Sequence, residues 1–246
     1  MEIWDAMIRY HKEIEKTYAA ILDEEKERLM EACQQIAEAI QQRDIFHIIG
    51  TGAHGSMAAE EMLWRVGGLA CANAILDPNV NLLFGANHSG IMDQTDCNCG
   101  AVLDANGVRP GDLLIIVNSS GINRYSTTLA KLCRERGIKT IAITSRFGLM
   151  LPEPRKENLF QLADLYIDNH MPYGDAAVQL EGYDQKVGPV SSLLNLFIVN
   201  LLVCGTIELL RQKGVEPPVW KYDACPGGEE FNQSLHERYR SKIVHL

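Results

Sequence analysis

Apolar residues recur at helical spacing through the first 43 residues of the chain. They alternate with charged and polar residues at Ile3, Met7, Ile14, Tyr18, Leu29, Cys33, Ile36 and Ile40. Intervals of three, four and seven residues place such side chains on one face of a helix. The pattern predicts an N-terminal helical arm over residues 1–43, built from one long helix or from two.

Five short apolar runs follow this arm. They occupy residues 45–49, 69–76, 113–117, 140–144 and 165–167. Several of them end in a turn rich in Gly, Ser or Asn and continue into a helical pattern. Strands that alternate with helices form parallel sheets covered by helices on both faces. The pattern therefore predicts an α/β fold whose doubly wound parallel sheet is mainly five-stranded. Residues 44–215 would form this unit and residues 216–246 a C-terminal extension, all within one structural domain.

One apolar segment, residues 191–210, is close to the length of about 20 residues that crosses a bilayer. Asn195, Asn200 and Glu208 interrupt it, and such groups are costly in lipid. We therefore expect a buried helix and no membrane association. Because this helix and the N-terminal arm both need apolar partners, we expect a homodimer or homotetramer with shared active sites.

The charge balance narrows the choice of ligand. Lys and Arg number 23 against 32 Asp and Glu, a net charge of −9. An acidic protein repels phosphate backbones and anionic lipid, so we expect no nucleic-acid partner. A small anion can still bind locally, because backbone amides at helix ends hold phosphate without net positive charge.

The cysteines point to a reducing compartment. There are seven, an odd number, and the N-terminus lacks the order of a signal peptide, so we expect a cytoplasmic protein. Cys97 and Cys99 lie near His88, Asp93 and Asp96. A single C-x-C pair lacks the spacing of the common zinc frameworks, so we expect no metal.

Two turns fall where a parallel sheet binds ligands, at the carboxyl ends of strands. The first, Gly50-Thr51-Gly52-Ala53-His54-Gly55, matches G-x-G-x-x-G. Asp77 follows about 20 residues later, where a dinucleotide enzyme places its ribose-binding acid. A nicotinamide-dependent oxidoreductase is therefore one interpretation.

The second turn, Asn118-Ser119-Ser120-Gly121-Ile122-Asn123, offers hydroxyls, amides and N–H groups at the start of a helix. These donors suit a phosphate dianion, although Ser and Asn also favour ordinary helix caps. A dinucleotide fold does not need this turn, and the chain lacks the Tyr-x-x-x-Lys pair of single-domain dehydrogenases. We therefore favour a phosphate ligand and expect no cofactor.

The chain resembles the sugar isomerase (SIS) domain over nearly its whole length. Within that family it is most similar to bacterial single-SIS-domain proteins labelled phosphoheptose isomerase. The shared strings are Ala59-Glu60-Glu61, Arg65-Val66-Gly67-Gly68, Pro110-Gly111-Asp112, Ile141-Ala142-Ile143-Thr144-Ser145, Gly174-Asp175-Ala176, Lys186-Val187-Gly188-Pro189 and Glu216-Pro217-Pro218-Val219.

The resemblance implies a sugar-phosphate ligand. Its binding residues would be Thr51, Gly52, Asn118, Ser119, Ser120, Gly121, Asn123 and Ser126. It also implies that Glu61 is the general base of an aldose–ketose isomerase acting through an enediol. Read without the resemblance, Glu61 and Arg65 form an i, i+4 ion pair on a helix surface.

The general acid is the point at which the chain departs from those isomerases. Alignment on Lys186-Val187 places Asp184 where they carry a histidine. His54 is our first choice for the acid. The alternatives are His88, His170, Asp184 working with Glu181, or a different reaction. Segment 83–107 could set substrate choice, and segment 220–232 could close over the ligand.

Three other functions stay open from the sequence. A protein of this family could bind a sugar phosphate without catalysis, as a sensor. It could instead be a lyase or etherase acting on an amino-sugar phosphate, using the same base. A nicotinamide-dependent oxidoreductase is the remaining alternative.

Overall fold

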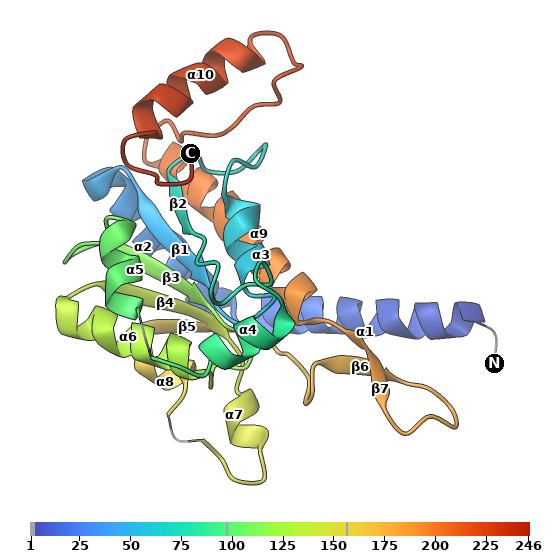
Figure 1. Cartoon of the computed structure of the whole chain (residues 1–246). Coiled ribbons are helices and arrows are strands. Elements are labelled where there is room, and N and C mark those ends of the chain that lie inside the picture. Colours follow the sequence, from blue (N-terminus) through green and yellow to red (C-terminus); the bar gives the residue numbers. More distant parts are fainter. Residues whose placement is uncertain (1–2, 97, 156) are drawn as a thin grey trace.

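A five-stranded parallel sheet forms the centre of the computed structural model, which describes residues 3–96, 98–155 and 157–246 (Figure 1). The strands lie in the order β2-β1-β3-β4-β5. All residues of the adjacent strands β1 and β3 are buried, which explains why both appear in the sequence as unbroken apolar runs. The bounds are β1 Phe46–Gly50, β2 Ala72–Ile75, β3 Leu113–Val117, β4 Lys139–Thr144 and β5 Leu165–Asp168.

Helices cover both faces of this sheet, which confirms the predicted doubly wound fold. One face packs on α2 Lys26–Arg43, α3 Ser56–Met62 and α9 Ser191–Gln212. The other packs on α5 Cys99–Ala105, α6 Arg124–Arg136 and α8 Leu159–Leu162. Two short helices, α4 Ala86–Met92 and α7 Phe147–Met150, lie toward the carboxyl ends of the strands (Figure 1).

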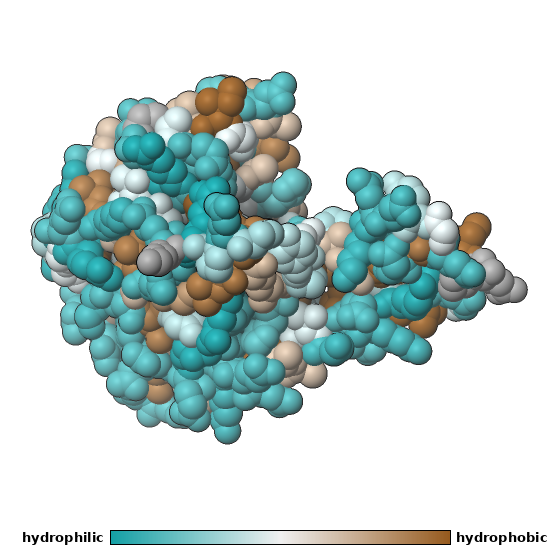
Figure 2. Space-filling model, turned by 90° about the horizontal axis from the view of Figure 1, so that it is seen from below, coloured by the Kyte–Doolittle hydropathy of each residue, from teal (hydrophilic) through white to brown (hydrophobic). Residues whose placement is uncertain are grey.

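The N-terminal arm consists of two helices, α1 Ile3–Glu24 and α2. α1 projects from the body, and an antiparallel hairpin of β6 Ala176–Gln179 and β7 Lys186–Pro189 lies beside it (Figures 1 and 2). Arg9 donates a hydrogen bond to the carbonyl oxygen of Gln179, and the Tyr10 hydroxyl donates to that of Pro189. The sequence did not predict this hairpin, whose strands are short and largely solvent-accessible.

A buried carboxylate fixes the break between α1 and α2 to the end of β5. Glu25 is 1% exposed, and its Oε2 accepts hydrogen bonds from Arg28 Nε at 2.7 Å and from the Asp168 N–H at 3.0 Å. Burial raises the pKa of Glu25, but interactions with His170, Arg28 and the Asp168 N–H outweigh it and lower the pKa to about 2. The arm is therefore anchored beside the loop that follows β5.

The apolar helix α9 packs against α2 and α3. By length and composition it is the one helix among the described residues that could cross a membrane. Its buried side includes Leu194, Ile198 and Leu202, and Phe197 stacks on Tyr18 of α1 at 4.2 Å between ring centroids. These contacts agree with the predicted buried helix.

The C-terminal extension lies at the amino ends of the strands. Val219 forms an isolated β-bridge with Leu69, and α10 Gly228–Tyr239 is held by ion pairs from Arg238 and Lys242 to Asp44. Asp44 precedes β1, so these contacts place the extension at the edge of the sheet opposite the two glycine-containing turns (Figure 1). Within a single chain, segment 220–232 therefore does not close over these two turns.

Candidate functional site

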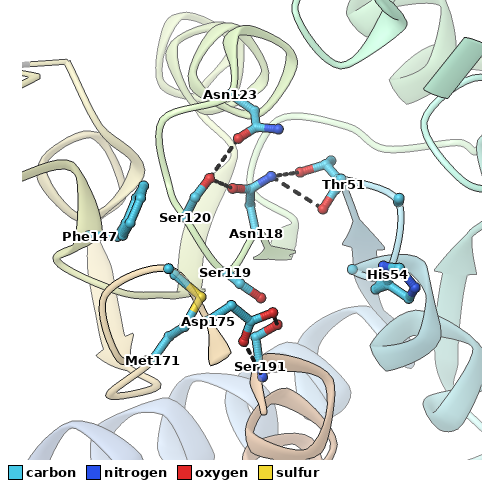
Figure 3. A pocket seen from close by; sticks show the side chains of 14 residues that line it. Thr51, His54, Asn118, Ser119, Ser120, Asn123, Phe147, Met171, Asp175 and Ser191 are labelled. Atoms are coloured by element: carbon cyan, nitrogen blue, oxygen red, sulfur yellow. Dashed lines mark hydrogen bonds between the residues drawn. The ribbon is translucent and has the colours of Figure 1, made fainter. Parts of the chain in front are cut away.

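The two glycine-containing turns meet in one pocket of about 350 Å³ (Figure 3). They follow β1 and β3, which are neighbours although β2 comes between them in sequence. Such a reversal of strand order opens a crevice at the carboxyl edge of a parallel sheet. The lining residues are Thr51, Gly52, Ala53, His54, Gly55, Asn118, Ser119, Ser120, Asn123, Phe147, Met171, Gly174, Asp175 and Ser191.

Asn118 ties the two turns together. Its Nδ2 donates to Thr51 Oγ1 at 2.9 Å, and its Oδ1 accepts from the Gly121 N–H at 2.8 Å (Figure 3). Thr51 and Asn118 are both almost fully buried. Their side chains therefore shape the pocket through internal hydrogen bonds, whereas the sequence predicted that they bind the ligand.

Ser119 and Ser120 present donors to the pocket. Ser119 Oγ accepts from Asn195 Nδ2 at 2.8 Å, which leaves its hydroxyl proton available to a ligand. The Ser120 hydroxyl lies 2.6 Å from Asn123 Oδ1, which accepts its proton in the absence of a ligand. Within the described part of the chain, the main-chain N–H groups of both serines make no internal hydrogen bond. Ser126, also expected in the site, is buried beneath the turn and donates to the Asn123 carbonyl.

A carboxylate that the sequence did not assign to the site lies behind this turn. Asp93 follows α4 and is 4% exposed. It accepts a hydrogen bond from the Asn123 side chain and one from the Gly52 N–H, and so contacts both turns. No ion pair to it occurs among the described residues. Burial therefore raises its pKa to about 6, against the smaller lowering effect of the Gly52 N–H.

This raised pKa predicts a specific pH dependence of stability. The folded state binds the Asp93 proton more tightly than the unfolded state, so this stabilisation is complete below pH 3.8 and is lost as pH rises through about 6. At about 1.36 kcal/mol per pKa unit, Asp93→Asn should gain about 2–2.5 kcal/mol relative to the wild type between pH 4 and pH 8. Urea unfolding of both proteins at several pH values measures the difference, and parallel pH curves would contradict it.

The catalytic residues expected from the sequence are only partly brought together. His54 lies in the pocket wall with its side chain exposed. Glu61 lies further along α3, outside the lining residues, and its Oε1 contacts Arg65 Nε at 3.2 Å and Asn200 Nδ2 at 3.3 Å. The Glu61–Arg65 ion pair is thus present, although α3 ends at Met62 and Arg65 lies in the turn that follows it. Asp184 is exposed in the β6–β7 hairpin and does not line the pocket.

The two alternative histidines have structural partners instead. His88 Nε2 is 3.4 Å from Asn79 Oδ1, and His170 Nε2 is 3.6 Å from the buried Glu25 carboxylate. The interaction with Glu25, joined by the Asp168 charge, raises the pKa of His170 against the effect of burial. Neither histidine lines the pocket.

The loop after β5 and the start of α9 form the remaining wall. Asp175 Oδ1 accepts from the Ser191 N–H at 2.8 Å, and Oδ2 accepts from its hydroxyl at 3.0 Å, so it caps α9 from a distant loop (Figure 3). Phe147 and Met171 add an apolar surface to the same side. Gly174-Asp175-Ala176 is one of the strings shared with the SIS family, but the sequence analysis assigned these side chains no role in the site.

Asp77, which the oxidoreductase interpretation requires as a ribose-binding acid, is buried and hydrogen-bonded within the protein. Asp77 is 6% exposed, and its carboxylate accepts from the Tyr125 hydroxyl at 2.7 Å and from the Asn79 N–H at 2.9 Å. It thus supports α6 within the protein. Among the described residues no group of three or more His, Cys, Asp or Glu side chains could hold a metal ion. Cys97 of the C-x-C pair lies outside the described residues.

Comparison with known proteins gives a consistent result. Residues 9–145 match the family model of the SIS domain. A UPF0309 protein of Caldanaerobacter subterraneus subsp. tengcongensis is 35% identical over 96% of this chain and 98% of its own, and one of Brucella canis is 33% identical over 97% and 98%. The phosphoheptose isomerase of Francisella tularensis has a similar fold, with a TM-score of 0.56 and 12% identity over 86% of this chain and 100% of its own. The phosphoheptose isomerase of Neisseria gonorrhoeae has a TM-score of 0.54 and 14% identity, over 83% of this chain and 98% of its own.

Proposed function

Because the chain belongs to the SIS-domain family, we propose that its pocket binds the phosphate group of a sugar phosphate. One observation carries this proposal: the serine hydroxyls and unpaired N–H groups of the second turn face a pocket that the first turn closes. The second turn also leads into the 13-residue helix α6, whose N-terminus favours an anion.

Removing these hydroxyls tests the proposal. Ser119→Ala and Ser120→Ala each delete a hydrogen bond to a charged ligand, worth about 1.5–3 kcal/mol, so each should weaken binding roughly 10- to 100-fold. Calorimetric titration with hexose, heptose and amino-sugar phosphates measures the change. Ser234→Ala on α10, at the opposite edge of the sheet, is the control and should bind normally. Stabilisation by NAD(H), with none by any sugar phosphate, would contradict the proposal.

We further propose that the protein isomerises this ligand between aldose and ketose. A base removes the proton from the carbon beside the carbonyl, and an acid protonates the carbonyl oxygen to give an enediol. The former carbonyl carbon is then reprotonated while the hydroxyl on the neighbouring carbon gives up its proton and becomes the new carbonyl. His54 is the pocket residue suited to exchange protons with the sugar oxygens. Glu61 is the candidate base, by the family resemblance.

Because Glu61 lies outside the pocket of its own chain, the reaction requires an association of copies that completes the site. We therefore propose a homodimer or homotetramer with shared sites. The exposed apolar residues of α1 support this: Ile3, Trp4 and Met7 are 80%, 63% and 56% exposed near the end of the projecting arm (Figure 2). Sedimentation velocity should show a dimer or tetramer.

We also propose a cytoplasmic location. It is supported by the free thiols of the described cysteines, which are Cys33, Cys71, Cys99, Cys133, Cys204 and Cys225.

A second candidate function is binding without catalysis. It is favoured by the Glu61–Arg65 ion pair, which gives the carboxylate a structural partner from the turn after α3. In that case sugar phosphates would bind to the pocket, but the protein would not exchange their carbon-bound protons with solvent.

A further inference from the structure

A second hollow, of about 620 Å³, lies between α10 and the turn that follows α3. We call it the tryptophan groove. It lies on the side of the amino edge of the sheet, where Figure 1 places α10, and shares no lining residue with the phosphate pocket. Its lining residues are Trp64, Trp220, Asp223, Glu229, Asn232, Gln233, His236 and Arg240.

Two indole rings form one wall of the tryptophan groove. Trp64 is 63% exposed, and its ring centroid lies 6.4 Å from that of Trp220, with 54° between the ring planes. Trp220 is buried and is fixed by main-chain bonds, since its N–H donates to Gly68 and its carbonyl accepts from Gly67. Trp64 has a φ of +47°, which a bulky side chain rarely adopts. Backbone strain that the surroundings maintain is often found at ligand sites.

Polar side chains of one helix face form the opposite wall. Glu229, Gln233 and His236 of α10 follow one another at intervals of four and three residues, and Arg240 continues the series at the helix end. Such residues lie on the same side of a helix. All of them carry hydrogen-bonding groups at the ends of their side chains.

The segment that joins the two walls is also held in place. Asn232 is 7% exposed, and its amide donates to the Asp223 carboxylate at 2.6 Å and bonds the main chain of Lys221. The Asp223 carboxylate is therefore positioned at the groove before any ligand arrives. The groove combines an aromatic surface with a preformed set of donors and acceptors.

The charges of the groove disfavour an anion and leave only a small net charge. The Asp223 and Glu229 carboxylates repel a phosphate, and the Arg240 guanidinium offsets one of these two charges. A pyranose ring matches both walls, because its faces are apolar C–H surfaces and its hydroxyls point outward around the edge. We propose that the tryptophan groove binds a neutral saccharide, with one ring stacked on Trp64 and its hydroxyls bonded to the polar face of α10.

The test uses the whole protein with neutral sugars as probes. Saturation-transfer NMR should detect millimolar binding of at least one of glucose, N-acetylglucosamine, maltose and cellobiose, and inorganic phosphate should not displace it. Trp64→Ala should weaken that binding at least tenfold. Trp4→Ala removes an indole of the same 63% exposure on α1 and should leave the binding unchanged.

A second variant keeps both indoles. Gln233→Ala changes an exposed residue of α10 and should weaken the sugar several-fold, which quenching of the intrinsic tryptophan fluorescence can follow. The proposal fails if none of the sugars binds, or if Trp64→Ala and Trp4→Ala behave alike. It also fails if choline binds in place of sugars, which would indicate a cation site. Failure of acrylamide to reach Trp64 in the purified protein would mean that another copy covers the groove, and would equally overturn it.

Discussion

Gly55→Ala should destabilise the protein by about 3 kcal/mol or more, which corresponds to a fall of roughly 6–12 °C in Tm. Gly55 has ordinary helical backbone angles, so the cost is steric. A Cβ at this position would lie 2.1 Å from the Thr51 carbonyl oxygen, and a Cβ on Gly50 would lie 1.9 Å from the Gly55 carbonyl oxygen. Both contacts are with main chain, which cannot swing aside.

Thermal and urea unfolding of Gly55→Ala measure this effect. Gly90→Ala is the matched control, because a Cβ in this exposed part of α4 would meet no atom within 4 Å. Alanine is the better helix former, so the control should be unchanged or up to about 1 kcal/mol more stable. A Gly55→Ala protein as stable as the wild type would show that the turn is looser than its packing indicates. Sugar-phosphate binding should fall with the stability, because the same turn lines the pocket.

The central fold could be predicted because its signals are local and strong. Residues 113–117 are apolar throughout, residues 141–143 are apolar between two threonines, and both runs are buried on their two faces. The two turns could be assigned to one edge of the sheet, because parallel strands all end on the same side. Sequence order alone did not show that β1 and β3 are neighbours, yet that adjacency brings Thr51 into contact with Asn118.

The parts that could not be predicted depend on distant contacts. Asp93 lies in segment 83–107, which has no clear periodic pattern, and its role follows from hydrogen bonds to Gly52 and Asn123. The β6–β7 hairpin is stabilised by Arg9 and Tyr10, more than 160 residues away in the chain. The position of α10 is set by Asp44. No propensity of the individual segments encodes these pairings.

The proposed isomerase makes Glu61→Gln the most informative catalytic variant. In D₂O the base exchanges the proton it has removed, so an isomerase incorporates deuterium beside the carbonyl of its sugar phosphate. Glutamine keeps the shape and the hydrogen bond to Asn200 but cannot accept the carbon-bound proton. Loss of a general base should lower the exchange rate about 10²- to 10⁴-fold. The Kd should change by less than about twofold, because the proposed phosphate contacts belong to the serine turn and glutamine keeps the shape of the side chain.

Glu60→Gln provides the control for charge, because it neutralises an exposed neighbour on the same helix and should exchange at the wild-type rate. If Glu61→Gln exchanges as fast as the wild type, Glu61 is not the base. If the wild type binds sugar phosphates and exchanges none of them, the protein is a binder, and the phosphate site stands without the isomerase.

Mixed oligomers then decide whether Glu61 serves the pocket of another copy. Glu61→Gln retains its phosphate site, and Ser119→Ala combined with Ser120→Ala retains its base, so each variant should be nearly inactive alone. If sites are shared, a mixture unfolded and refolded together contains pockets with intact serines from one chain and Glu61 from the other. In a dimer with random pairing, half of the molecules are mixed and each holds one complete site, so about a quarter of the wild-type exchange rate should return.

The control is a mixture of the two folded variants that has not been unfolded. If subunits exchange slowly between oligomers, this mixture contains no mixed dimers and should stay inactive. A refolded mixture that stays as inactive as its components would show that each chain must supply its own base. The position of Glu61 outside its own pocket would then argue for the binder.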